Sequence, residues 1–280
     1  MRPFEDILIT ADYDRTLTGP DGTLPERNLE AIRYFMERGG TFTVNTGRSP
    51  VTARAIMEQV PVNAPFLLMN GSVSCLNGVF ADEKVIDLDP WTVLDRLAET
   101  FPEVKLEVQG LDAHYILDTS AEDVALYERK NWALVPVESG DDVGVFLKFN
   151  VMPRQRKDLN LVLQETENAE LYDRITAMIE ENWGDKLEVF RSGAQLLNVH
   201  AKGVSKLKAA RQLQQKLGKK ILICIGDAGN DIPMLEGADY AFCPADGQVA
   251  GQFETVCDSG DGAVADVIYK KITEIMGVQP

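Results

Sequence analysis

Several short apolar runs, rich in β-branched residues, have the pattern of strands buried on both faces of a parallel sheet. Helical patterns alternate with them: one begins near Pro25 and ends at two glycines, and another ends near Gly218. Alternating strands and helices predict an α/β fold, a doubly wound and mainly parallel Rossmann-like sheet. The apolar runs occupy residues 7–11, 41–45, 66–69, 221–226 and 240–243.

The middle of the chain has a different pattern, because its strand candidates mix polar and apolar residues. Such strands suit a sheet with one face in water. Amphipathic helical patterns at residues 91–101 and 171–182 lie between them. We therefore expect a core domain of residues 1–81 and 200–280 that carries an inserted α+β cap, residues 82–199. The expected strands of this cap are residues 106–109, 114–118, 160–164 and 196–200.

Size and charge narrow the possible partners. A chain of 280 residues suits two unequal domains. The net charge of -16 makes nucleic acid a poor partner, and a phosphorylated ligand would need a local cation. The sequence has no apolar run near the ~20 residues that span a membrane and no signal-peptide pattern, which predicts a cytoplasmic protein. The four widely spaced cysteines are expected to be reduced, and nothing indicates the oligomeric state.

Polar residues follow four of the predicted core strands: Asp12, Thr46, Asn70 and Asp227. Each alone is also a natural turn or cap residue. Ligands of open parallel sheets bind outside the carboxyl ends of the strands, so four such residues from separate parts of the chain favour a site there.

The acidic residues suggest a metal. Asp12 and Asp14 are two apart on an extended chain and point to the same side, where they repel each other unless a cation binds or one holds a proton. Hard oxygen ligands suit Mg²⁺. Asp227 would add a third carboxylate and Asp231 a fourth, although Asp231 could also cap the helix that contains Pro233.

The sequence after residue 45 suggests an oxyanion site. Thr46 and Gly47 end a strand, and Ser49 and Pro50 have the pattern of a helix cap and first helical residue. Free N–H groups and a hydroxyl would then face an anion such as phosphate. Arg48 could reach the same anion or simply lie exposed on the surface.

A lysine near residue 205 is the candidate cation, with Lys202, Lys206 and Lys208 as the choices. Ser205 is a plausible N-cap, which places Lys206 in the first turn of a helix. A cation there opposes the helix dipole at a cost of ~0.3 to 1 kcal/mol, so its placement indicates a function.

Together these residues carry a family resemblance. The segments DYDRTLT, VNTGR, GVSK and GDAGND, in this order, resemble the four motifs of the haloacid dehalogenase-like phosphatase superfamily. The long insertion between the second and third motifs resembles the large cap of its Cof-type branch. The resemblance covers nearly the whole chain.

This resemblance implies the catalytic roles. Asp12 would be the nucleophile and Asp14 the general acid and base. Thr46 would hydrogen-bond the transferring phosphoryl group, and Lys206 would balance its charge. Gly47 and Arg48 are further phosphate-binding candidates.

The same resemblance implies the metal site. Asp227 would hold Mg²⁺ together with the carboxylate of Asp12 and the backbone carbonyl of Asp14. Asp231 would support this arrangement from outside the ligand set, and Asn230 would help to bind the substrate.

Two positions depart from the family, which usually has glycine at each. Arg15 must either adopt an ordinary negative φ or accept backbone strain. Leu207 stands where glycine often follows the lysine of the third motif.

The function expected is Mg²⁺-dependent hydrolysis of a small phosphomonoester, a sugar phosphate or related metabolite, through an aspartyl-phosphate. The carboxylate at Asp14 favours a phosphatase or a phosphosugar mutase over a dehalogenase. A phosphomannomutase-like enzyme would need a second phosphate site, and residues 82–199 contain no extra arginine cluster for one. A non-enzymatic phospho-acceptor or binding protein is the third alternative, but receiver modules are shorter and lack a cap.

The histidines and tryptophans of the insertion are expected to have structural rather than catalytic roles. His114 and His200 fall in expected strands of the insertion, and Trp91, Trp132 and Trp183 lie at or near its helices. The natural substrate is not indicated, because specificity is expected to reside in cap loops.

Overall fold

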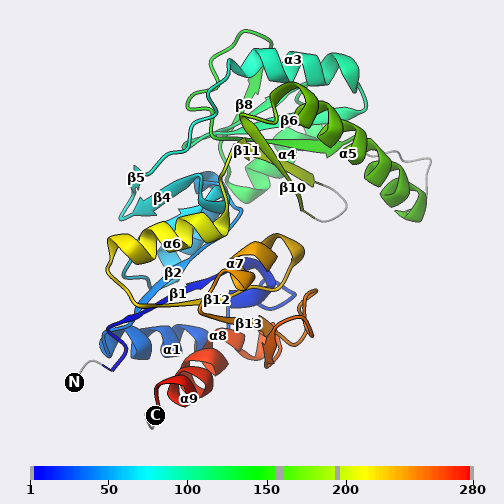
Figure 1. The fold of residues 1–280 in the computed structure, drawn as a ribbon. Coiled ribbons are helices and arrows are strands. Elements are labelled where there is room, and N and C mark those ends of the chain that lie inside the picture. Colours follow the sequence, from blue (N-terminus) through cyan, green and yellow to red (C-terminus); the bar gives the residue numbers. More distant parts are fainter. Residues whose placement is uncertain (1–2, 155–160, 193–195, 278–280) are drawn as a thin grey trace. The chain divides into compact units, whose positions relative to one another are not determined.

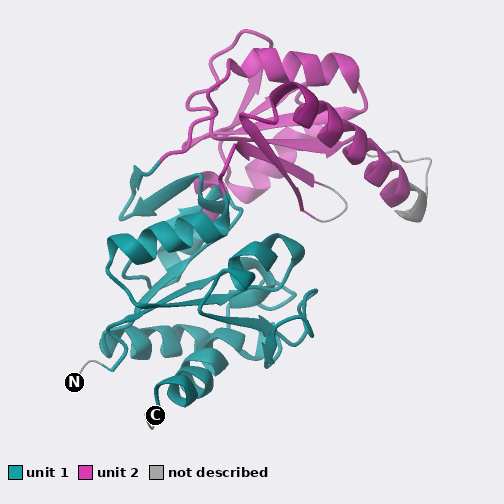
Figure 2. Cartoon of the chain, in the orientation of Figure 1, with its two compact units in different colours: residues 1–48, 54–82, 205–280 teal, residues 49–53, 83–204 magenta. Residues whose placement is uncertain are grey.

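The computed structural model describes residues 3–154, 161–192 and 196–277. The chain forms two compact units (Figure 2). Unit 1 comprises residues 1–48, 54–82 and 205–280, and unit 2 comprises residues 49–53 and 83–204. Within the described residues, no helix is long and apolar enough to cross a membrane.

Unit 1 is built on a five-stranded parallel sheet in the order β14-β13-β12-β1-β2. The interior strand β1 is buried along its whole length, as its apolar sequence predicts. Ile9 of β1 lies between Ile223 of β12 and Phe42 of β2. The strands are β1 (Ile7–Ala11), β2 (Thr41–Val44), β12 (Ile221–Ile225), β13 (Tyr240–Pro244) and β14 (Glu254–Val256).

Helices cover both faces of this sheet, which confirms the doubly wound α/β class (Figure 1). One face packs on α6 and α7, through buried residues such as Leu213 and Met234. Figure 1 shows α1, α8 and α9 on the other face. The helices of unit 1 are α1 (Glu26–Glu37), α6 (Lys206–Lys216), α7 (Ile232–Glu236), α8 (Ala263–Asp266) and α9 (Ile272–Met276), while α2 (Pro50–Gln59) has residues in both units.

The predicted strand at residues 66–69 forms, but its pairing differs from the expectation. β3 (Phe66–Leu68) joins the parallel sheet only through an isolated bridge between Asn45 and Leu67. It pairs antiparallel with β4 (Val73–Leu76), which pairs with β5 (Val79–Ala81). The reason is local: all three residues 69–71 have positive φ, so the chain reverses there into a hairpin.

Unit 2 contains a six-stranded sheet in the order β10-β11-β9-β6-β7-β8. One face of this sheet packs on α3 and α5 through apolar residues such as Val108, Leu97 and Ile175. The strands are β6 (Val104–Gln109), β7 (His114–Leu117), β8 (Leu134–Val137), β9 (Lys148–Pro153), β10 (Leu187–Ser192) and β11 (Leu196–Ala201), and the helices are α3 (Pro90–Thr100), α4 (Ala121–Lys130) and α5 (Leu161–Trp183).

Two expectations for this unit are wrong. Residues 161–164, expected in a strand, are the first residues of the helix α5, and residue 160 lies outside the described residues. A five-residue apolar run cannot by itself distinguish a strand from a helix. The second face of the sheet is polar, as expected, but it is buried. Its buried residues are Glu107, Gln109, His114, Lys148, Asn150, Asn198 and His200.

Candidate active site

Asp12 follows directly from the buried strand β1. Its backbone N–H donates to the carbonyl of Ile225 (2.9 Å), so the strand pairing continues to this residue and fixes its position. The side chain is buried, with 7% of the residue exposed. A carboxylate buried at the end of an interior strand needs a compensating charge.

Lys206 supplies that charge from the first residue of α6. Its ammonium donates to Oδ1 of Asp12 (2.6 Å) and to Oδ1 of Asp231 (2.7 Å), and it is buried. The side chain of Ser205 accepts the N–H of Lys208 (3.1 Å), so the predicted N-cap is confirmed. The two carboxylates offset the unfavourable position of a cation at a helix N-terminus.

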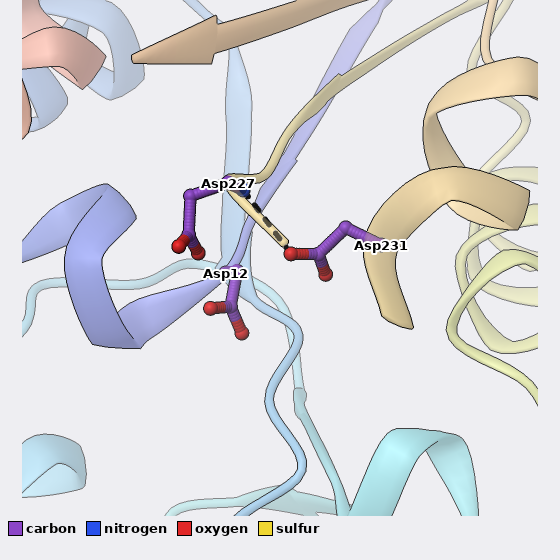
Figure 3. Close-up of side chains that lie close together, drawn as sticks. All are labelled: Asp12, Asp227 and Asp231. Atoms are coloured by element: carbon purple, nitrogen blue, oxygen red, sulfur yellow. Dashed lines mark hydrogen bonds between the residues drawn. The ribbon is translucent and has the colours of Figure 1, made fainter. Parts of the chain in front are cut away.

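Two further carboxylates come from the segment after β12 (Figure 3). Oδ2 of Asp231 accepts the backbone N–H groups of Asp227 (3.1 Å) and Ala228 (3.2 Å). Although Asp231 precedes α7, its side chain makes no capping bond to that helix. Asp12, Asp227 and Asp231 each offer an oxygen, and these oxygens lie within 4.8 Å of one another. This group of three is called the acidic cluster below.

The electrostatics of the acidic cluster favour an additional cation. Burial raises the pKa of Asp12 to about 8, against the lowering effect of Lys206. Burial and the charge of Asp231 raise the pKa of Asp227 to about 6. Burial alone would lower the pKa of Lys206, but the carboxylates of Asp12 and Asp231 raise it above its usual value. The three carboxylates outnumber the single buried ammonium, so protons or a divalent ion must compensate the remaining charge.

The side chain of Asp14 lies outside the acidic cluster. It is about half exposed and forms a bidentate pair with Arg48, with Nε to Oδ2 at 2.8 Å and Nη2 to Oδ1 at 2.6 Å. Arg48, for which the sequence left anion binding and simple exposure open, therefore holds the second carboxylate of the first motif.

Of the two conformations considered for Arg15, an ordinary negative φ or a strained positive one, the residue adopts the positive one, with a φ of 58°. A non-glycine residue in this left-handed region costs on the order of 1 kcal/mol or more. The turn closes when Thr18 N–H donates to the carbonyl of Tyr13 (3.0 Å). Inside it, Thr16 Oγ1 donates to Asp227 Oδ1 (3.2 Å), while Arg15 Nε lies 4.0 Å from Asp227 Oδ2.

Thr46 is buried after β2, but its neighbourhood is less open than expected. Its N–H donates to the carbonyl of Leu67 (2.9 Å), and its Oγ1 accepts the N–H of Arg48 (3.2 Å). The N–H groups of Thr46 and Arg48 are therefore engaged within the protein. A Cβ on Gly47 would lie 3.1 Å from Oδ1 of Asn70, so a larger residue would crowd that side chain.

The remaining motif residues have structural neighbours that the sequence did not indicate. Leu207 packs against Gly237, where an added Cβ would lie only 2.4 Å from the leucine side chain. Asn230 is half-buried on the short turn Gly229–Asp231. Asn45, which the sequence patterns did not single out, is buried and donates from Nδ2 to the carbonyl of Lys206 (2.9 Å). Its polar side chain at the end of an apolar run was the available signal.

Comparison with known proteins identifies the family. A model of haloacid dehalogenase-like hydrolases matches residues 9–254. The chain belongs to the haloacid dehalogenase-like hydrolases. The predictions of this family, of its Cof-type branch and of a phosphatase-type enzyme are confirmed.

Several curated relatives of this hydrolase are phosphatases by name. It is 28% identical over 246 residues to YbjI of Escherichia coli K12, covering 84% of this chain and 83% of the relative. It is 22% identical over 238 residues to YcsE of Bacillus subtilis 168, covering 82% and 80%. Both are named 5-amino-6-(5-phospho-D-ribitylamino)uracil phosphatase. In fold, the hydrolase resembles SMU.1108c from Streptococcus mutans, with a TM-score of 0.77, 21% identity and coverage of 95% and 98%.

Proposed function

We propose that this protein is a Mg²⁺-dependent phosphatase that hydrolyses a small phosphomonoester, a sugar phosphate or related metabolite, through an aspartyl-phosphate on Asp12. The observation that carries the proposal is the contact of Asp12 with Lys206 inside the acidic cluster. A buried carboxylate held by a cation beside two further acids suits attack on a dianionic ester, because phosphoryl transfer depends mainly on positioning and charge neutralisation.

The residues present fit a magnesium ion. The acidic cluster offers hard oxygen ligands from Asp12 and Asp227 close together, which is the donor set that Mg²⁺ prefers. Asp231, whose carboxylate already binds Lys206 and two backbone N–H groups, would orient the others. When bound, the ion would neutralise charge on the ester and on the attacking carboxylate.

The side chains divide the reaction between them. Asp12 attacks phosphorus, and Lys206 fixes its carboxylate while offsetting charge on the phosphoryl oxygens. Asp14 donates a proton to the leaving alcohol and then removes one from the water that hydrolyses the intermediate, a role typically worth ~10² to 10⁴ in rate. Thr46 binds the phosphoryl group through its hydroxyl. Arg48 sets the direction of the Asp14 carboxylate.

We also propose that residues 82–199 act as the cap that selects the substrate. The relatives YbjI and YcsE are named for a substrate with a phosphorylated ribityl chain, which makes phosphorylated polyols a natural first class to test. A cytoplasmic location remains a prediction.

Three arginines of unit 2 favour a phosphatase over a mutase. Arg154 pairs with Asp118 (2.7 Å), and Arg191 pairs with Asp173 (2.8 Å). Arg174 lies 3.7 Å from Glu103. Among the described residues, these guanidinium groups have separate acidic partners rather than a shared focus that could hold a second phosphate.

The test is a screen of phosphorylated metabolites with purified protein and Mg²⁺, measuring free phosphate and sugar isomers separately. Phosphate release that is lost in Asp12→Asn and after chelation of the metal is the expected result. Formation of an isomer without free phosphate would support the mutase alternative. Stable phosphorylation without turnover would support the phospho-acceptor, and inactivity on every ester and metal would contradict the proposal.

A further inference from the structure

A chain of buried hydrogen bonds begins at the residue that follows Arg48. Ser49 immediately precedes α2, and its Oγ accepts the N–H of Thr52 (3.2 Å), which is a capping bond. The same Oγ lies 2.6 Å from Nε2 of His114, on β7 of unit 2. Because unit 1 runs to Arg48 and unit 2 includes residues 49–53, the peptide bond between Arg48 and Ser49 is a point where the chain passes from one unit to the other.

The other ring nitrogen of His114 extends the chain. Nδ1 lies 2.8 Å from the hydroxyl of Tyr127, on α4, and that hydroxyl donates to Oε2 of Glu107 (2.8 Å). Glu107 accepts further bonds at Oε1 from the amides of Gln109 (2.6 Å) and Asn150 (3.0 Å). The four residues Ser49, His114, Tyr127 and Glu107, called the relay below, are all buried.

The relay has one consistent direction. The hydroxyl of Tyr127 donates its only proton to Glu107, so the phenol oxygen must accept a hydrogen bond from Nδ1–H of His114. In a neutral imidazole the other nitrogen is then an acceptor, so Ser49 donates its hydroxyl proton to Nε2. A neutral ring fits the site because burial lowers the pKa of His114, although Glu107 opposes this shift.

Arg48 is held on both sides by this arrangement. Within unit 1, its N–H donates to Thr46 Oγ1 and its carbonyl accepts the N–H of Met69 (2.9 Å). On the other side, the relay fixes the next residue, Ser49. The backbone of Arg48 therefore lies between bonds made within unit 1 and the bond of Ser49 to His114.

We propose that His114 is a positioning residue, which through Ser49 holds the backbone of Arg48 so that its guanidinium presents the Asp14 carboxylate to the leaving group. This role rests on the proposed phosphatase function, in which Asp14 is the general acid. The site consists of a His114 ring locked in the Nδ1–H tautomer by Tyr127 and Glu107.

The test compares two esters that differ in their need for an acid. p-Nitrophenyl phosphate has a good leaving group that departs without protonation, whereas a phosphorylated alkyl alcohol found active in the screen requires it. With His114→Asn or Ser49→Ala, we expect kcat on the alkyl ester to fall about 10-fold, and kcat on the aryl ester to change less than about 2-fold. KM for both esters should change little, because binding of the phosphoryl group does not involve the relay.

Conservative variants separate positioning from folding. The amide of His114→Gln reaches the position of Nε2 and can accept from Ser49, so it should recover most of the lost rate. The double variant Ser49→Ala with His114→Asn should be no slower than either single one, because both remove the same bond. As a control, His200→Asn replaces a buried histidine three strands away in the same sheet, and it should leave the ratio of the two rates unchanged.

Two outcomes would overturn the proposal: equal slowing of both esters, or rates of His114→Asn and Ser49→Ala that match the wild type. A wild-type protein that hydrolyses neither ester would instead contradict the proposed function and, with it, the role of His114. The tautomer is tested without activity by ¹⁵N NMR of the imidazole. A proton on Nδ1 is expected, and a proton on Nε2 would contradict the relay.

Discussion

Replacing Lys206 with methionine is the sharpest test of how the acidic cluster is held together. The substitution removes one buried ammonium and both of its hydrogen bonds, to Asp12 and Asp231, while nearly preserving the volume of the side chain. Removing one partner of a buried ion pair typically costs ~3 to 5 kcal/mol, because the remaining charge is left buried and uncompensated. We therefore expect the metal-free variant to lose about that much free energy of unfolding at pH 8.

The pH dependence of this loss has a definite sign. Without the ammonium, the pKa of Asp12 rises further above about 8, so the carboxyl holds its proton in the folded state. The wild-type Asp12 gives up this proton only as the pH passes about 8, so the loss should be nearly constant from pH 5 to pH 7 and should grow as the pH rises above 8. Added Mg²⁺ should restore part of the stability at pH 8, because it replaces the missing positive charge.

The assay must report on unit 1. Trp91, Trp132 and Trp183 all belong to unit 2, so urea unfolding should be followed by circular dichroism rather than by tryptophan fluorescence alone. Lys208→Met is the matched control, because Lys208 is exposed two residues further along the same helix, and its effect should stay within about 0.5 kcal/mol. A Lys206→Met protein as stable as Lys208→Met at pH 8 in a metal chelator would refute the reasoning.

Other predictions concern pH and backbone conformation. Because the folded pKa of Asp12 is raised from 3.8 to about 8, its contribution to stability is present below about pH 4 and is lost as the pH rises to 8. The melting temperature measured in a chelator should therefore fall less between pH 4 and pH 8 in Asp12→Asn than in the wild type. Arg15→Gly should be more stable than Arg15→Ala by ~1 kcal/mol, since only glycine relieves the positive φ, and equal urea midpoints would contradict that strain. Gly71→Ala should cost at least ~2 kcal/mol more free energy of unfolding than Gly78→Ala. Both glycines have positive φ, but a Cβ on Gly71 would lie 2.5 Å from Ala209 Cβ, whereas a Cβ on Gly78 would have no atom within 4 Å. Similar losses of the two variants on urea unfolding would argue against this close packing.

Local sequence patterns predicted the fold best where the pattern fits only one kind of secondary structure. The apolar run at residues 7–11 forms the fully buried strand β1, and the Ser205 cap placed Lys206 at the start of its helix. The strand predicted at residues 161–164 is wrong because a short apolar run fits a strand and a helix equally well.

The acidic residues of the site were visible in the sequence because they follow two buried strands by a few residues, Asp12 and Asp14 after β1 and Asp227 and Asp231 after β12. Their partners were less visible. The bidentate pair of Asp14 with Arg48 joins two loops that are far apart in the chain, and no spacing rule indicates it. For Arg15 the sequence left a negative and a positive φ open. The turn that imposes the positive φ is closed by hydrogen bonds of the backbone, which the residue types do not indicate.

The passage of the chain between units at Arg48 and Ser49 bears on how such enzymes can be recombined. Unit 2 is assembled from residues 83–204 together with the short segment 49–53, which is distant in sequence. A chimera that transplants only the long insertion from a relative would separate His114 from the serine to which it bonds. Exchange of substrate preference by grafting should therefore succeed more often when residues 49–53 are transferred with the insertion, as a module made of two segments.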